Sequence, residues 1–206
     1  MVFPWNNPTA AAIFLRADYL WAVFDHAARA DFSNLTAAFS NNVITAEQLA
    51  NRHATILRFK VPEDRSLSAV LDELDWIVDV TETPTPPDRP LTVERELDVH
   101  GGARIFVPAL DTGNKWDLRD PEVGDILAIV PIKSPGHGMA QERLFAEFHL
   151  LPSAQGIVVQ LLSERVDVEP RRNGVRIIGE NGLILSTGHL PDRHECSRPK
   201  NGVSVF

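Results

Sequence analysis

The chain has a single cysteine, Cys196, among its 206 residues. One cysteine excludes an intrachain disulfide and any zinc site built from several cysteines. An excess of positive charge is also missing, since 20 lysines and arginines stand against 28 aspartates and glutamates, for a formal net charge of −8. Because proteins that grip a phosphate backbone need a basic surface, nucleic acid is not an expected partner.

Long uninterrupted apolar segments are absent too. Residues 10–24 are the most apolar stretch, but Arg16 and Asp18 interrupt them. They therefore fall short of the roughly 20 apolar residues that a membrane-spanning helix needs. No basic segment precedes them, as it would in a standard secretory signal. We expect a cytoplasmic protein that makes no membrane contact.

The common catalytic and cofactor-binding motifs are missing as well. The sequence contains no glycine-rich dinucleotide or phosphate loop, no paired-histidine zinc motif, no serine-hydrolase elbow, no CxxC and no EF-hand loop. Internal repeats, low-complexity tracts and sustained heptads are also absent. No cofactor is expected, and an enzyme of a common class is disfavoured.

A proline-rich segment, residues 81–90, is the feature around which the chain is organised. It holds four prolines in ten residues and no large apolar side chain. Proline removes an amide donor and favours extended backbone before it, so this segment can continue neither a helix nor a central strand. We interpret it as a semi-rigid connector between two parts of different character.

Residues 8–30 are predicted to form one helix. Asn7-Pro8 is typical of a helix start, because a capping side chain precedes proline at the first helical position. At 100° per residue, Asp18, Asp25 and Arg29 fall on one narrow stripe, while apolar side chains cover most of the remaining circumference. A surface helix has one apolar face, so this helix needs cover on several sides, from its own core or from a partner.

Further helices are expected before the connector. Residues 31–39 are predicted to form a short helix, and the capping box of residues 45–48 to start another that runs to about His53. Residues 55–60 suit either a strand or the end of that helix. Residues 66–79 show the clearest helical spacing, with acidic residues on the opposite side. The apolar positions of this spacing are Leu67, Val70, Leu71, Leu74, Ile77 and Val78.

Strand and turn signals dominate after the connector. Residues 91–99 and 103–109 flank a His-Gly-Gly turn and predict a hairpin. Residues 126–132 are nearly all apolar, as in a strand buried on both faces. The second part of residues 139–151 favours a strand. Asn-Gly pairs at 173–174 and 181–182 are typical of type I′ turns, so strands near 157–168, 175–180 and 183–187 are expected to form an antiparallel meander.

These patterns together predict an α+β protein. Residues 1–80 form its helical region, residues 81–90 the connector, and residues 91–206 an antiparallel β domain built as a β-meander sandwich or small barrel. The two parts can share one core, because three short helices cannot bury all of the apolar surface of the first helix.

The segment 188–196 carries the only cluster of reactive side chains. Its residues are of the types that ligate zinc or act as base and nucleophile, but their spacing matches no standard zinc motif. A polar tail leaving the last strand is the favoured explanation for them. A loop histidine, His137, is a further candidate. The candidate catalytic residues are His189, His194, Cys196 and His137, and the candidate metal ligands are His189, Asp192, His194 and Cys196.

Both ends of the sequence are apolar, in residues 1–5 and 203–206. Leaving a large apolar side chain exposed costs about 1.5–3 kcal/mol, so both segments are expected to dock on their own domain or on a neighbouring subunit. The predicted interface residues are Phe3, Trp5, Phe14, Trp21, Phe24, Val203, Val205 and Phe206.

Three classes of function remain open from these patterns. The leading hypothesis is a non-catalytic structural or interaction subunit of a larger assembly, with a protein partner or a homo-oligomer as its context. A metal-dependent or cysteine hydrolase using the His/Cys cluster is the first alternative. A β-barrel module that binds a small ligand is the second, and it rests on architecture alone.

Overall fold

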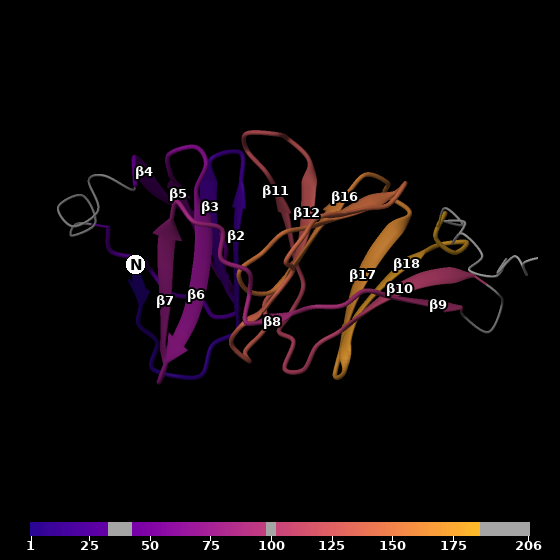
Figure 1. Ribbon diagram of the computed structural model, residues 1–206, viewed down its shortest axis with the longest axis horizontal. Coiled ribbons are helices and arrows are strands. Elements are labelled where there is room, and N and C mark those ends of the chain that lie inside the picture. The colour runs from indigo at the N-terminus through magenta and orange to yellow at the C-terminus, as the bar shows by residue number, and fades with distance from the viewer. Residues whose placement is uncertain (33–42, 98–101, 186–206) are drawn as a thin grey trace, which may run out of the picture.

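The computed structural model describes residues 1–32, 43–97 and 102–185, and within these ranges the chain is entirely β (Figure 1). The strands are β1 (Val2–Phe3), β2 (Ala11–Arg16), β3 (Tyr19–Phe24), β4 (Thr45–Leu49), β5 (Thr55–Lys60), β6 (Ser66–Asp72), β7 (Asp75–Thr81), β8 (Arg89–Pro90), β9 (Glu94–Leu97), β10 (Ala103–Pro108), β11 (Trp116–Arg119), β12 (Ile126–Val130), β13 (His137–Gly138), β14 (Arg143–Leu144), β15 (Phe148–Leu151), β16 (Ile157–Leu161), β17 (Val166–Arg171) and β18 (Gly174–Gly179).

Four antiparallel sheets carry most of these strands. Sheet 1 has the order β1-β7-β6, sheet 2 the order β2-β3-β5-β4, sheet 3 the order β11-β12-β16-β15-β14 and sheet 4 the order β17-β18-β10-β9. Three apolar cores lie between successive sheets: the 1–2 core, the 2–3 core and the 3–4 core. Sheets 2 and 3 are therefore covered on both faces. Strands β4–β7 lie at one end of the long axis, and β9, β10, β17 and β18 lie at the other (Figure 1).

The predicted helix of residues 8–30 is wrong, because residues 11–24 form the β2–β3 hairpin. Ala17 and Asp18 make its two-residue turn with φ of 47° and 61°, as in a type I′ turn. Alternate side chains enter different cores, which explains an apolar pattern with no polar face. Those in the 1–2 core are Ala11, Ile13, Leu20, Ala22 and Phe24, and those in the 2–3 core are Ala12, Phe14, Trp21 and Val23.

The predicted helix of residues 66–79 is also wrong. These residues form the β6–β7 hairpin, closed by the pair Asp72–Asp75. Leu67 and Trp76 point into the 1–2 core, whereas Val70, which the helical spacing placed on the buried face, is 51% exposed. A period of two on each strand had mimicked the helical spacing across the turn.

The predicted capping box is a strand as well. Residues 45–49 form β4, and the Gln48 side chain bonds the backbone of Ala28 and Ala30 rather than a helix N-terminus. Residues 55–60 form strand β5, which resolves the alternative left open for them. The short helix predicted for residues 31–39 lies mostly outside the described residues.

The antiparallel β character predicted after the connector is confirmed, although its details differ. Strands β9 and β10 pair as the predicted hairpin, and four consecutive residues of β12, from Leu127 to Val130, have no exposed surface. Residues 157–168 are not one strand: β16 and β17 belong to sheets 3 and 4. The β17–β18 turn consists of Arg172 and Asn173, neither with positive φ, so it is not the type I′ turn expected one residue later.

The connector runs extended along the surface, and its end forms β8, which pairs in parallel with β13. The division into residues 1–80 and 91–206 stays a prediction, but the 2–3 core combines side chains from both parts. The outer edge of β2 forms bridges with two loops of sheet 3: Ala11 pairs with Ile132, just after β12, and Ile13 pairs with Gln155, between β15 and β16. Gly156 (φ 80°) allows this approach, since a Cβ there would lie 2.8 Å from the Ala12 Cα.

Candidate functional site

An apolar groove lies beside β1, on the side away from β7. It encloses a cavity of about 530 Å³. Phe3 packs against Phe24 and Phe59 with ring centroids 5.2 and 5.9 Å apart, and Trp5 lies 5.0 Å from Phe24. We call this surface the β1 groove. Its lining consists of residues 1–5, Phe24, residues 28–32, Thr55, Leu57 and Phe59.

The β1 groove exists because sheet 1 is narrower than sheet 2. Strand β6 contacts β2, and Phe3 of β1 lies over β3 and β5, so three strands cover a sheet of four. The space beside β1 and above β5 holds no strand in the described part of the chain. The indole N–H of Trp5 is buried there without a hydrogen-bond partner among the described residues. An apolar surface of this kind suits a binding role.

The β1 strand is firmly held on its inner side. The Met1 amino group donates to the Val78 carbonyl at 2.6 Å, and the Val78 N–H donates to the Met1 carbonyl at 2.8 Å. Burial lowers the pKa of the Met1 amino group, and the nearby negative charge of Asp79 opposes that shift. The groove wall therefore belongs to the sheet and is not a loose extension.

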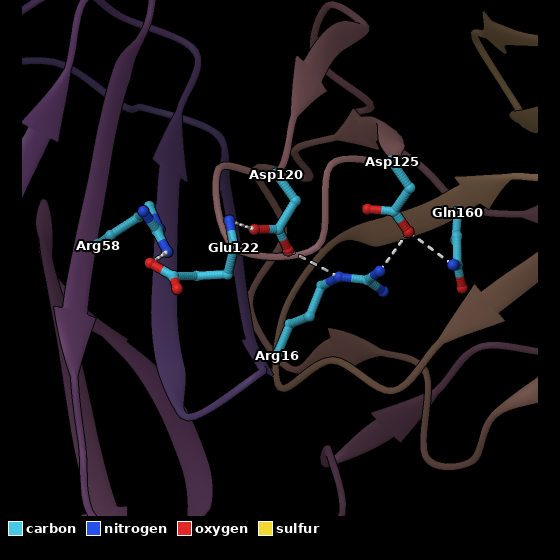
Figure 2. Close-up of polar contacts among 6 residues, drawn as sticks. All are labelled: Arg16, Arg58, Asp120, Glu122, Asp125 and Gln160. Atoms are coloured by element: carbon cyan, nitrogen blue, oxygen red, sulfur yellow. Dashed lines mark hydrogen bonds and ion pairs between the residues drawn. The ribbon is translucent and has the colours of Figure 1, made fainter.

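The second candidate site is a partly buried polar network between sheets 2 and 3 (Figure 2). The Arg16 guanidinium donates from Nε to Asp120 at 2.9 Å and from a terminal nitrogen to Asp125. Asp120 is 1% exposed and also accepts the Glu122 N–H, and Asp125 accepts from Gln160 at 2.6 Å. The network joins the end of β2 to the β11–β12 turn.

Arg58 forms the neighbouring contact across the same two sheets. Its guanidinium carbon lies 4.0 Å from the centre of the Tyr19 ring and 4.8 Å from that of Trp21. One terminal nitrogen binds Glu47 at 2.5 Å. The other lies 3.4 Å from Glu122 (Figure 2). Only 2% of Arg58 is exposed. Stacking on two aromatic faces stabilises such a buried cation.

Both polar clusters consist of an arginine held by carboxylates, and the Arg16 network also includes the Gln160 amide. Neither cluster contains a histidine, serine or cysteine. Over the described ranges, no group of three or more His, Cys, Asp or Glu residues could hold a metal ion. The arrangement can tie sheets 2 and 3 together, and the Asp125 Oδ1 is buried without a hydrogen-bond partner among the described residues.

The candidate catalytic and metal-binding residues fall in two places. His137 lies in β13, where its Nδ1 is 3.1 Å from the carbonyl oxygens of both Ser134 and Pro135. His189, Asp192, His194 and Cys196 lie outside the described residues, so their roles stay predictions.

The predicted interface residues separate into three groups. Phe3 and Trp5 line the β1 groove. Phe14, Trp21 and Phe24 have no exposed surface, and Phe14 stacks on Trp21 at 5.8 Å inside the 2–3 core. Phe14 and Trp21 are enclosed between sheets 2 and 3, whereas Phe24 belongs to the 1–2 core and lines the β1 groove. Val203, Val205 and Phe206 lie outside the described residues.

The residues that sequence reasoning missed are Arg16, Arg58, Asp120 and Asp125. Their only signal was charge within or beside strongly apolar segments, where an isolated charge is costly and needs a partner. No helix long and apolar enough to cross a membrane occurs in the part of the chain that the structure describes. Comparisons with protein-family models, with curated proteins and with solved structures found no match.

Proposed function

We propose that the protein is a non-catalytic interaction subunit of a larger protein assembly, and that the β1 groove is its docking site. The observation that carries the proposal is the groove itself: an apolar cavity of about 530 Å³ with aromatic walls, beside a sheet edge that has no neighbouring strand among the described residues. Aromatic side chains dominate the binding energy of protein interfaces, and Phe3, Trp5 and Phe32 supply them here.

The described residues show no polar cluster free to act on a substrate, which also supports an interaction subunit. The polar clusters there are engaged in joining sheets, and the ring nitrogen of His137 faces two backbone carbonyls. The described sheets are open and packed face to face, so they enclose no barrel interior for a small ligand.

Site-specific photo-crosslinking tests the proposal. A photoreactive amino acid replaces Arg29, at the groove, in the full chain expressed in its native cells. A matched variant carries it at Leu144, which is 66% exposed on β14, in a different sheet. We expect a discrete crosslinked protein from position 29 and none from position 144. Equal products from both positions, or no product from position 29, would contradict the proposal.

A further inference from the structure

The β1 groove lies where a further strand of sheet 1 would be placed. Sheet 1 ends at β1, whereas sheet 2 continues beneath it through β5 to β4. A fourth strand in sheet 1 would lie beside β1 and cover the inward side chains of β5. An extended segment with alternating apolar residues fits such a place, because alternate side chains enter the groove while its backbone bonds to the edge.

The backbone of β1 is oriented to accept such a segment. Met1 exchanges both backbone hydrogen bonds with Val78. In an antiparallel pair the next residue then directs its N–H and C=O away from that partner, so those of Val2 face the outer edge. The Val2 side chain lies on the solvent face of the sheet and is 57% exposed. Sheet 1 therefore offers one donor and one acceptor beside an apolar cavity.

We propose that residues 203–206 of a second copy of this chain add as a strand beside β1. This segment reads Val-Ser-Val-Phe, so Val203 and Val205 share one face of a strand and would enter the groove. Phe206 would lie on the other face, over the exposed side chain of Val2. The inference rests on the proposed function and names the partner.

Charge favours this occupant. Residues 186–206 contain three Lys or Arg residues and two Asp or Glu residues, for a formal charge of +1, so the rest of the chain carries −8 − 1 = −9. The β6–β7 hairpin of sheet 1 has four acidic residues and no lysine or arginine. Arg198 and Lys200, just before the docking residues, would lie near this acidic hairpin.

The geometry of the stack favours a second copy over the same chain. Leu185, the last described residue, packs on the 3–4 core, whereas the groove lies on the outer side of sheet 2. Three gaps of about 10 Å each separate sheet 1 from sheet 4. Seventeen residues link Leu185 to Val203 and reach about 60 Å only when fully extended, whereas a random coil of this length averages about 23 Å from end to end, less than the separation of sheets 1 and 4. A groove that receives a different segment of the next copy makes a head-to-tail contact, which can continue from copy to copy.

Three full-length variants test the proposal by sedimentation velocity. V203D/V205D places two charges in residues 203–206, which we call the donor segment because this segment enters the groove of the other copy. V2P alters the groove, which we call the acceptor: it removes the outward N–H at an edge position where proline is tolerated. L144D is the matched control, an apolar-to-acid change on another exposed strand. Urea unfolding checks that each variant folds, and R198E/K200E provides a second donor variant that keeps the apolar residues.

We expect wild type and L144D to form dimers and larger species as concentration rises. The donor and acceptor variants should associate at least about tenfold more weakly and remain near 22.9 kDa. An equimolar mixture of V203D/V205D with V2P should form a 1:1 dimer and nothing larger, because each supplies the element that the other lacks.

Three results would overturn the inference: a wild type that stays monomeric, association unaffected by V203D/V205D, or a mixture that stays monomeric. A monomeric wild type whose Trp5 emission shifts in V203D/V205D would mean docking within one chain, and it too would overturn the second-copy proposal. A crosslink from position 29 to a different protein, without self-association, would sink this inference and leave the proposed function standing.

Discussion

Replacing Arg16 by methionine tests whether the network of Figure 2 joins sheets 2 and 3. Methionine keeps most of the side-chain volume but leaves the carboxylates of Asp120 and Asp125 without their cation. Asp120 is 1% exposed and cannot recover solvation, whereas the Asp125 side chain is 18% exposed. Breaking a buried ion pair costs 3–5 kcal/mol, so we expect a loss of about 3 kcal/mol. That is a large fraction of the 5–15 kcal/mol typical of a folded domain.

Urea unfolding at neutral pH measures this loss, with tryptophan fluorescence as the probe, since Trp21 and Trp76 are fully buried. A triple variant, R16M/D120N/D125N, separates charge from packing. Once both carboxylates are neutral amides, most of the lost stability should return, with a coupling of about 2 kcal/mol. The Asn side chain at position 120 can still accept the Glu122 N–H.

An exposed ion pair provides the control. Glu82, which binds Arg65, is 81% exposed, and E82Q should cost less than about 1 kcal/mol. If R16M costs no more than E82Q, the Arg16 network does not join the sheets and the reasoning fails. The same holds if the triple variant is no more stable than R16M.

The remaining predictions concern single turns and one ion pair. G156A should destabilise by more than 2 kcal/mol in urea unfolding, whereas G124A should cost about 1 kcal/mol; both have positive φ, but only the first Cβ would strike a neighbouring strand, so equal losses would contradict the packing argument. Replacing Ala17-Asp18 by Asn-Gly should stabilise by about 1 kcal/mol, and a lower melting temperature would argue against the type I′ turn. A hydrogen bond from Lys115 lowers the pKa of Asp167, so this carboxylate stabilises the fold above the unfolded pKa near 3.9. D167N should therefore cost less than about 1 kcal/mol of unfolding free energy at pH 7, and nothing once the pH falls below the folded pKa. An equal cost at the two pH values would refute this link between the pKa and stability.

Local chemistry was sufficient for much of the second part of the chain. Strand β7 ended before the prolines at 84–90, and residues 126–130 formed a strand that is buried on both faces from Leu127 to Val130, as predicted. The antiparallel pairing of β9 with β10 was also predicted, because the two glycines between these segments favour a turn. These signals act over a few residues, which is why the sequence alone carries them.

Residues 8–30 and 66–79 show what the sequence could not decide. A strand with both faces covered has no polar side, and neither has a buried helix, so periodicity cannot separate them. Sheets 1 and 3 pack on the two faces of sheet 2, and this packing favours strands over a helix. Alternate side chains of β2 and β3 then lie in the 1–2 core and in the 2–3 core. In β6 and β7 the apolar residues alternate along each strand, but the turn at residues 73–74 shifts the second set so that the combined spacing resembles that of a helix.

The candidate sites divide in the same way. The composition of residues 1–5 predicted that they dock on their own domain or on a partner, and Phe3 and Trp5 line the β1 groove; a partner there stays a prediction. The groove itself arises from three strands lying over four, which no local pattern contains. Arg16 and Asp120 lie 104 residues apart, and only the packing of sheet 2 on sheet 3 brings them to 2.9 Å. Contacts between distant segments are set by which apolar faces bury one another, and the tertiary structure alone decides that.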